Sequence, residues 1–298
     1  MAYNHDINAI APLPSAASSV NSLSLHSRRR GSQRRAFSSL QAALCGLLFC
    51  GDLLFARAVL STTMRGLYFN LDTRMIDKRI ATVEEAFAGI ADGAKVMVSG
   101  FGGAGLPVVL IRALEAGGAG DLTLILNSLR FIETYAPALF TDRRVIKTVS
   151  SAARSRGKGT AVYEYQVEEG FLDAEILPQG TFAESIRAGG SGIPAYFTPT
   201  GVGTKLTEGK EVREFDGRPC VLEPALTADF AIMRATVADR WGNVSFVGTQ
   251  SNFGPAMAMA ADIAVVEVDE VRDEPLDPRE VDIPGIFVQR VIAVPDER

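Results

Sequence analysis

Short apolar runs recur along the chain from residue 95 onward, and each is followed by glycine or polar residues. Runs of this length, bounded by turn signals, are typical of strands that are buried on both faces of a sheet. The sequence therefore predicts a series of buried strands. These are Lys95–Val98, Leu122–Leu126, Val145–Val149, Ala174–Leu177, Phe230–Arg234, Val244–Phe246 and Ile263–Val268.

Segments with helical signals separate these strands. Thr82 and Glu85 have the spacing of a capping box, which predicts a helix that continues to about Ile90. A proline in the first turn opens the next predicted helix, Pro107–Ala116. Because strands and helices alternate, the predicted fold class is α/β, with a mainly parallel sheet and flanking helices. The later predicted helices are Tyr163–Glu169 and Thr181–Ala188.

Charge and residue types divide the chain into two parts. Residues 1–74 contain eight Arg against three Asp, whereas the remaining residues contain 22 Lys and Arg against 32 Asp and Glu. An acidic body repels phosphates, so neither nucleic acid nor an anionic membrane is an expected partner. Both histidines and two of the three cysteines lie in the first part, which leaves Cys220 alone in the body. His-dependent triads, His/Cys metal sites and a disulfide framework are therefore excluded for residues 75–298.

We expect residues 1–74 to be an extension outside the fold of residues 75–298. Their Arg-rich, acid-poor start precedes an apolar run from Leu40 to Phe55, which Asp52 interrupts. One interpretation is an overlong start, with translation beginning at Met75 or Met64; the other is a segment for export or organelle targeting. The run is too short and too interrupted to predict a membrane span.

A glycine-rich loop connects the first predicted strand to the helix that begins at Pro107. The spacing Gly100-x-Gly102-x-x-Gly105 matches the pattern of dinucleotide-binding loops. Such proteins also need an acidic residue after the second strand, where this chain has Asn127, so a nicotinamide cofactor is not expected. Glycines permit close backbone approach, and a helix N-terminus attracts a phosphate, a carboxylate or a thioester oxyanion. A tight turn without a ligand is the alternative.

Ordered sequence blocks cover roughly residues 75–295. They are Asp92–Pro107, Pro178–Gly190, Phe197–Thr204, Glu208–Lys210, Ala228–Ala231, Asp239–Asn243, Asn252–Pro255 and Ile283–Val288. In composition and order the blocks resemble the A subunit of class I coenzyme A (CoA) transferases of the 3-oxoacid type. Ser99 stands where that family has glycine. The blocks are most similar to members that use succinyl-CoA with 3-oxoadipate or acetoacetate.

The resemblance implies the fold of CoA-transferases (NagB/RpiA-like) and a covalent mechanism. In that mechanism a glutamate on the partner, the B subunit, attacks the acyl-CoA and carries CoA as a glutamyl thioester until the acceptor acid takes it. No catalytic residue is then expected in this chain, which needs that partner in an A2B2 heterotetramer. CoA thioesters and carboxylic acids are the implied substrates, with no permanently bound cofactor and no metal. The alternative is a non-catalytic CoA- or ligand-binding module of the same fold. An enzyme that depends on CoA is expected in the cytoplasm.

The resemblance also assigns expected site residues. The glycine loop is the expected CoA-binding element, and its N–H groups can also steady negative charge on a thioester oxygen. Asn127, Gly201, Gly203 and Asn252 are candidates for the substrate cleft. The two glycines could instead only shape a turn, and Asn252 could cap the next helix. The loop consists of Ser99, Gly100, Phe101, Gly102, Gly103, Ala104 and Gly105.

Three loops depart from the family pattern. The first reads Asn-Ser-Leu-Arg where relatives tend to read Asn-Asn-Ala-Gly. Because loops at strand ends hold ligand contacts in α/β folds, these changes bear on the acyl substrate more than on the reaction class. Arg130, Arg154 and Arg156 are candidates for binding a second carboxylate or the CoA phosphates, with exposed solubilising residues as the alternative. The three loops are residues 127–130, 150–156 and 250–251.

Other polar or reactive side chains are expected to be structural. Glu184 and Arg187 lie three positions apart on a predicted helix, which favours a surface ion pair. Glu168 and Glu169 are expected to be solvated. Cys220 is expected to be a buried small apolar residue.

Overall fold

The computed structural model describes residues 76–152 and 160–294. The expected extension 1–74 lies outside the described residues, as do Arg154 and Arg156. Arg74–Arg298 forms one compact unit. Within the described ranges, no helix combines the length and the apolar character that crossing a membrane requires.

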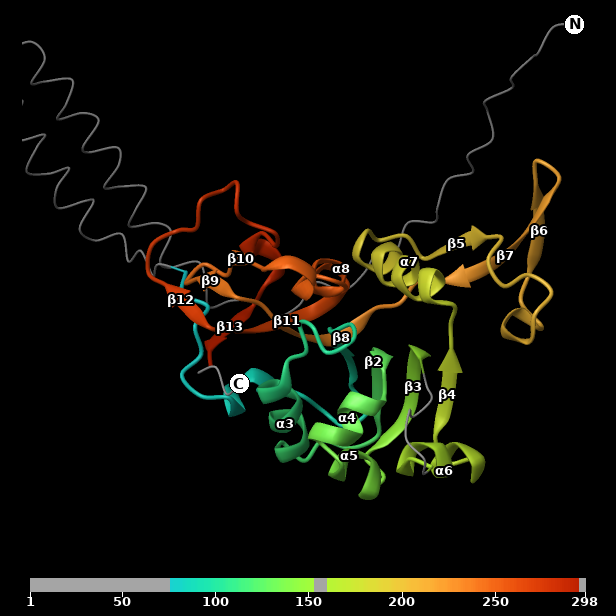
Figure 1. Ribbon diagram of the computed structural model, residues 1–298, viewed down its shortest axis with the longest axis horizontal. Coiled ribbons are helices and arrows are strands. Elements are labelled where there is room, and N and C mark those ends of the chain that lie inside the picture. The colour runs from blue at the N-terminus through green and yellow to red at the C-terminus, as the bar shows by residue number, and fades with distance from the viewer. Residues whose placement is uncertain (1–75, 153–159, 295–298) are drawn as a thin grey trace, which may run out of the picture. The chain divides into compact units, whose positions relative to one another are not determined.

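A parallel sheet of seven strands forms the centre of this unit, in the order β13-β11-β8-β1-β2-β3-β4 (Figure 1). Every neighbouring pair in it runs parallel. The chain builds β1 to β4 outward on one side of β1 and then returns to place β8, β11 and β13 on the other side. The strands are β1 (Lys95–Val98), β2 (Leu122–Ser128), β3 (Val145–Ala152), β4 (Asp173–Ile176), β8 (Ala228–Arg234), β11 (Ala261–Val268) and β13 (Arg290–Ala293).

The central strands are apolar because both faces of the sheet are covered. In β1, Val96 and Val98 point into one hydrophobic cluster, while Met97 points into the other. All three are at most 1% exposed. Continuous apolar runs rather than alternating ones are the pattern that a sheet buried on both faces requires.

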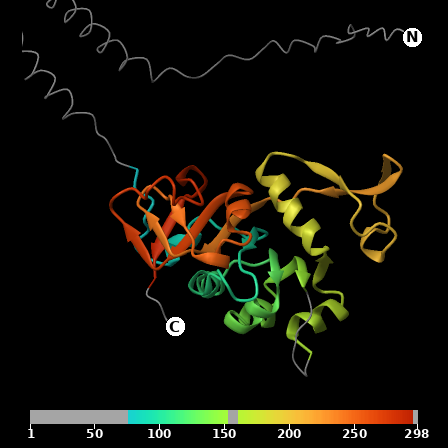
Figure 2. The same ribbon diagram turned by 45° about the horizontal axis from the view of Figure 1, so that its top comes forward.

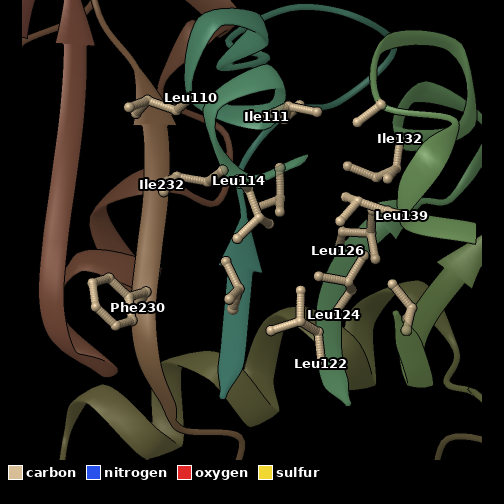
Figure 3. Packing of buried hydrophobic residues seen from close by; sticks show 14 of the residues in the cluster. Leu110, Ile111, Leu114, Leu122, Leu124, Leu126, Ile132, Leu139, Phe230 and Ile232 are labelled. Carbon is tan, nitrogen blue, oxygen red and sulfur yellow. The ribbon is translucent and has the colours of Figure 1, made fainter. Parts of the chain in front are cut away.

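Helices cover the two faces separately (Figure 1). Those on the first face are α3 (Val108–Ala116), α4 (Arg130–Tyr135), α5 (Ala138–Thr141) and α6 (Val162–Glu168). Those on the second face are α7 (Gln179–Gly190) and α8 (Gly254–Met259). On the first face, the α3 side chains Leu110, Ile111 and Leu114 lie above Leu124 and Ile232 of the strands (Figure 3).

Two small sheets complete the unit. One contains β9 (Val237–Asp239), β10 (Val244–Ser245) and β12 (Glu270–Arg272). The other contains β5 (Ala195–Thr198), β6 (Val212–Phe215) and β7 (Arg218–Pro224), and its β6–β7 hairpin extends away from the main sheet in both views (Figure 1, Figure 2). The short 3₁₀ helices are η1 (Glu84–Phe87), η2 (Lys205–Thr207), η3 (Gly248–Gln250) and η4 (Gly285–Phe287).

The structure confirms the predicted α/β class with its mainly parallel sheet, and each predicted strand is present with small changes at its ends. The prediction of a helix from Thr82 to Ile90 is wrong, because only one 3₁₀ turn forms there. The Glu85 carboxylate accepts the N–H of Ala81 at 3.1 Å instead of capping a helix from Thr82. Gly89 then reverses the chain with a φ of 91°, which brings it to the start of β1.

Leu124 provides a test of the core that supports the sheet. It is fully buried in β2 on the face covered by α3 and α4. We expect Leu124→Ala to lower the free energy of unfolding by about 2–5 kcal/mol, because a buried cavity replaces the lost side-chain atoms. Urea denaturation of both proteins measures this. Leu206→Ala, at a position that is 40% exposed, is the control, and an equal loss in both variants would contradict the assignment of Leu124 to the core.

Candidate functional site

The glycine loop lies where the strand order of the sheet reverses. It follows β1, whose neighbours are β2 on one side and β8 on the other. In open parallel sheets, the carboxyl ends of strands at such a switch point leave a crevice in which ligands bind. The loop is therefore placed by topology at the position most suited to a binding site.

The tip of the loop is a tight hairpin. Phe101 and Ala104 exchange two backbone hydrogen bonds of 3.0 Å each. Between them, Gly102 and Gly103 both adopt positive φ angles, of 62° and 96°. Two successive positive φ angles define a turn that glycine forms without steric cost. In the described part of the chain, the N–H groups of Gly102 and Gly103 form no hydrogen bond, which leaves two donors at the tip.

Ser99 lies beneath the loop rather than on its surface. Its side chain is 1% exposed, and its hydroxyl donates a hydrogen bond of 3.0 Å to the carbonyl of Gly105. Its backbone N–H continues the sheet by donating to the carbonyl of Ile232 at 3.0 Å. The serine that replaces the glycine of the family pattern thus closes the base of the loop and does not obstruct its outer face.

Asn252 holds the loop from the side. Its Oδ1 accepts the N–H of Gly100 at 3.1 Å, while its Nδ2 donates to the carbonyl of Ala104 at 3.0 Å. The same amide nitrogen contacts the carbonyls of Thr249 and Gln250 at 3.1 and 2.9 Å. Asn252 is therefore a positioning residue for the loop. It does not cap α8, whose start has no side-chain cap.

Gly105 has no room for a side chain. A Cβ atom at this position would lie 2.3 Å from the carbonyl oxygen of Gln250 and 2.9 Å from Nδ2 of Asn252. Its φ of 67° is also in the left-handed region. Close backbone approach to the segment before α8, rather than to a ligand, is the reason for glycine at this position.

A cavity of about 350 Å³ lies beside the loop tip. It is bounded by the tip, by the residues at the carboxyl ends of β2 and β3, by the start of α4 and by the first residue of α7. The lining residues are Phe101, Gly102, Asn127, Ser128, Arg130, Phe131, Ala152 and Gln179. The structure therefore brings the predicted residue Asn127 together with the predicted loop.

Asn127 belongs to a connected set of polar side chains in the cavity wall. Its Nδ2 donates to the Oγ of Ser151 at 2.7 Å and to the Oε1 of Gln179 at 2.9 Å. The Ser151 hydroxyl donates to the same Gln179 oxygen at 2.7 Å. These bonds fix the amide of a residue that is only 6% exposed. Neither Ser151 nor Gln179 was named as a site residue, although Ser151 lies in the segment 150–156 that was expected to bear on the acyl substrate and Gln179 is part of the sequence block that opens α7.

Gly201 and Gly203 lie elsewhere. Neither lines the cavity beside the loop. The carbonyl of Gly201 accepts hydrogen bonds from the hydroxyls of Thr204 and Thr207, both at 2.7 Å. A Cβ atom on Gly201 would lie 3.7 Å from Pro178, and one on Gly203 would meet no atom within 4 Å. In this structure, Gly201 shapes the turn between β5 and η2.

The N-terminus of α3 already holds an anionic group of the protein itself. Glu267, at the end of β11, accepts the N–H of Leu110 at 2.9 Å, and the nearby backbone N–H groups of Val108 and Val109 also favour its ionised form. The structure therefore corrects the expectation that this helix end is open to a phosphate or a thioester oxyanion. The backbone donors left for a ligand in the described part of the loop are those at its tip, the N–H groups of Gly102 and Gly103.

Burial governs the ionisation of Glu267, which is 2% exposed. Loss of solvent raises the pKa of its carboxyl to about 7, although the backbone N–H groups and Arg234 act in the opposite direction. The Arg234 guanidinium lies 3.7 Å from Glu267 and also pairs with Asp269. A buried, paired carboxyl of this kind joins β8, β11 and α3 immediately behind the loop.

The remaining predicted side chains are structural. Glu184 and Arg187 form the expected surface ion pair at 2.5 Å. Cys220 is buried and free, as predicted. Buried Asp239 accepts the backbone N–H groups of Trp241 and Asn243, both at 3.0 Å. The block Asp239–Asn243 therefore shapes a turn, and none of its residues lines the cavity.

Comparisons with known proteins agree with this geometry. The family described as "Coenzyme A transferase" matches residues 80–294. The A subunit of the 3-oxoadipate CoA-transferase of Pseudomonas putida is 48% identical over 221 residues, which cover 74% of this chain and 95% of that protein. The A subunit of the succinyl-CoA:3-ketoacid coenzyme A transferase of Xanthomonas campestris pv. campestris is 43% identical over 225 residues, 74% of this chain and 91% of that protein.

Solved structures share the fold at lower identity. The glutaconate coenzyme A-transferase of Acidaminococcus fermentans superimposes with a TM-score of 0.64 at 22% identity, covering 73% of this chain and 76% of that one. The decarboxylase AibA/AibB superimposes with a TM-score of 0.62 at 25% identity, covering 74% of this chain and 84% of that one. The fold therefore serves more than one reaction.

Asn252→Asp tests the clamp on the loop. The substitution keeps the side-chain size but turns a donor that faces three carbonyl oxygens into a negatively charged acceptor. We expect the free energy of unfolding to fall by about 2–3 kcal/mol at neutral pH. Urea denaturation measures the loss. Gln289→Glu is the matched amide-to-acid control, because exposed Gln289 accepts through its oxygen from Ala264, and a loss there as large as in Asn252→Asp would contradict the clamp.

Glu267→Gln tests the buried carboxyl. The folded protein raises the pKa of Glu267 from its ordinary 4.5 to about 7, so this group stabilises the fold most fully below about pH 4.5. That contribution is lost as the pH rises through about 7, whereas glutamine does not titrate. We therefore compare the free energy of unfolding of the wild type with that of Glu267→Gln. The difference, wild type minus variant, should fall by up to about 3 kcal/mol between pH 4 and pH 8. Urea denaturation across this range measures it, and a difference that does not change with pH would be the contrary result.

Proposed function

The chain belongs to the coenzyme A transferase family, and we propose that it is the A subunit of an enzyme that moves CoA from succinyl-CoA to a 3-oxoacid. The main support is the 48% identity to the A subunit of a 3-oxoadipate CoA-transferase along 95% of that protein. Family and fold alone do not carry the proposal, because a fold hosts several reactions. Similarity along nearly the whole relative, together with a donor-lined cavity at the switch point, supports this reaction.

The described lining of the cavity supplies hydrogen-bond donors but no carboxylate and no thiol. Its described lining residues include glycine backbone, amides, a hydroxyl, an arginine and two phenylalanines, and they include no Asp, Glu or Cys. We therefore expect the carboxylate that attacks the acyl-CoA to come from another chain. This is the arrangement that the family mechanism requires, in which a glutamate of the B subunit forms the covalent thioester with CoA.

The residues of this chain would bind and orient the reacting thioester. The N–H groups of Gly102 and Gly103 lie beside the cavity without a partner among the described residues. When the nucleophile adds to the thioester carbonyl, negative charge develops on the carbonyl oxygen, and two fixed donors stabilise that charge. The clamp by Asn252 keeps the loop in position, so that little reorganisation is needed when the charge forms.

The polar set around Asn127 would hold the substrate on the opposite wall. Hydrogen bonds to Ser151 and Gln179 lock the orientation of its amide. A locked side chain loses less conformational freedom when a ligand binds, which favours affinity for one orientation of the acyl group. We therefore assign Asn127 and Gln179 to positioning of the substrate, and Ser99 to support of the loop.

We further propose that the enzyme is an A2B2 heterotetramer and that residues 75–298 form its A-subunit domain. The relatives are named as A subunits, which supports the presence of a B partner. Residues 1–74 precede the segment that matches the family. An enzyme that consumes CoA thioesters works where CoA is available, so we place its activity in the cytoplasm.

Co-expression with the B subunit tests this function. We expect the chain alone to transfer no CoA. The A–B complex should transfer CoA from succinyl-CoA to 3-oxoadipate or acetoacetate. Chromatography of the thioesters measures the transfer. Mass spectrometry of the complex with succinyl-CoA should show CoA attached to the B partner, because the described lining of this cavity has no carboxylate and no thiol.

Two outcomes would contradict the proposal. Turnover by the isolated chain would show that the nucleophile lies in it. A stable complex that binds CoA thioesters but exchanges none would instead identify a non-catalytic ligand-binding module. The control replaces the nucleophilic glutamate of the B partner by glutamine, which should abolish the adduct while leaving the complex intact.

A further inference from the structure

Arg130 is the charged side chain in the wall of the cavity beside the glycine loop. It is the first residue of α4, which begins shortly after β2. No other residue in the described lining of the cavity is ionisable. An anionic group of a ligand in this cavity would therefore meet one positive charge, at a fixed place.

An aromatic ring connects Arg130 to the tip of the loop. The guanidinium carbon of Arg130 lies 4.8 Å from the centre of the Phe131 ring. A Cβ atom on Gly103 would lie 3.9 Å from two atoms of the same ring. The guanidinium is thus held about one ring width from the backbone donors of the tip, and stacking on the ring limits its conformations.

Arg130 keeps its hydrogen-bonding capacity for a ligand. In residues 76–152 and 160–294, its guanidinium forms no ion pair and no hydrogen bond. Glu133, an acidic residue of the same helix, does not pair with Arg130 and accepts the N–H of Val162 at 2.6 Å. Arg143 shows the contrast: it stacks on Phe171 at 4.7 Å in the same way, but it is paired with Glu169 at 2.8 Å. A stacked guanidinium without an acidic partner is a site that accepts a carboxylate in a bidentate manner.

The size of the cavity selects which part of the substrate lies there. Its volume of about 350 Å³ is near the lower limit of small-molecule sites, which span about 300–1,000 Å³. A short acyl chain fits such a volume, whereas the nucleotide part of CoA needs a larger groove. With the thioester carbonyl at the loop tip, the far end of the acyl chain would extend along Phe131 toward Arg130.

We propose that Arg130 binds the remote carboxylate of a dicarboxylic acyl group and so makes the enzyme selective for 3-oxoacids that carry a second carboxylate. This inference rests on the proposed function, and it narrows the acceptor to the 3-oxoadipate type over the acetoacetate type.

The test compares two acceptors in the assembled A–B complex. 3-Oxoadipate has the second carboxylate and acetoacetate lacks it. In a double-displacement reaction, kcat/KM for the acceptor reports only the half-reaction that starts from the enzyme–CoA thioester. We expect Arg130→Gln to lower kcat/KM for 3-oxoadipate by about 10- to 100-fold, because a charge-assisted pair is lost. The value for acetoacetate should stay unchanged.

Two further variants separate charge from folding. Arg130→Lys keeps the charge but loses the bidentate geometry, so its kcat/KM for 3-oxoadipate should lie between those of the wild type and Arg130→Gln. Arg143→Gln removes the equivalent stacked arginine outside the cavity and should leave both acceptors unaffected. Thermal unfolding and co-purification with the B partner show whether each variant is folded.

Several outcomes would overturn the inference. A wild-type complex that prefers acetoacetate would do so directly. An equal loss of kcat/KM for both acceptors in Arg130→Gln would also overturn it. A higher KM of this variant for succinyl-CoA and acetoacetyl-CoA alike would place Arg130 on a CoA phosphate. A complex that transfers CoA to acetoacetate but not to 3-oxoadipate leaves the proposed function standing and removes only this inference. A complex that transfers CoA to neither acid contradicts the proposed function itself.

Discussion

The arrangement of the site depends on one side-chain amide. Asn252 binds the backbone at both ends of the glycine loop, from a position 152 residues further along the chain than Gly100. A loop of glycines has many accessible conformations, and fixing one of them has an entropic cost that contacts must offset. The amide offsets it with an oxygen that accepts and a nitrogen that donates, and no other uncharged side chain of this size offers both. The absence of a side chain at Gly105 permits the Asn252 amide and the Gln250 carbonyl to lie this close to the loop.

A second constraint explains which donors remain for a ligand. The N-terminus of α3 is the strongest fixed positive dipole near the loop. Glu267 occupies it, and Arg234 in turn neutralises Glu267. The helix end therefore contributes to the cohesion of β8, β11 and α3, and the N–H groups of the loop tip are the backbone donors that the proposed reaction would use. A glycine loop before a helix is thus not by itself a sign that the helix dipole holds the ligand.

The sequence predicted those parts of the fold that depend on local patterns. The apolar runs identify the sheet strands because burial on both faces demands them, and the strand–loop–helix unit around Gly100 was placed correctly. The helix predicted from Thr82 and Glu85 does not form, since a capping box is only a local signal and the Glu85 carboxylate accepts the N–H of Ala81 instead. The site was only partly predictable. The strand pattern predicted that Asn127 lies at the carboxyl end of β2, and the structure places it in the cavity wall, whereas Gln179 lies there only through the folded topology, which no local pattern encodes.

The proposed division of chemistry between two chains fits the contents of the cavity. A wall of backbone donors, amides and one guanidinium can recognise an acyl group but cannot attack it. If the attacking carboxylate belongs to the B subunit, as proposed, the residues that choose the acyl group are separated from those that break its bonds. Substitutions in the segment from Asn127 to Phe131 can then change the preferred acid while the nucleophile and the loop stay as they are. Such a separation is consistent with one fold serving a glutaconate CoA-transferase and a decarboxylase. In the proposed enzyme, the start of α4 would then determine the substrate rather than the reaction.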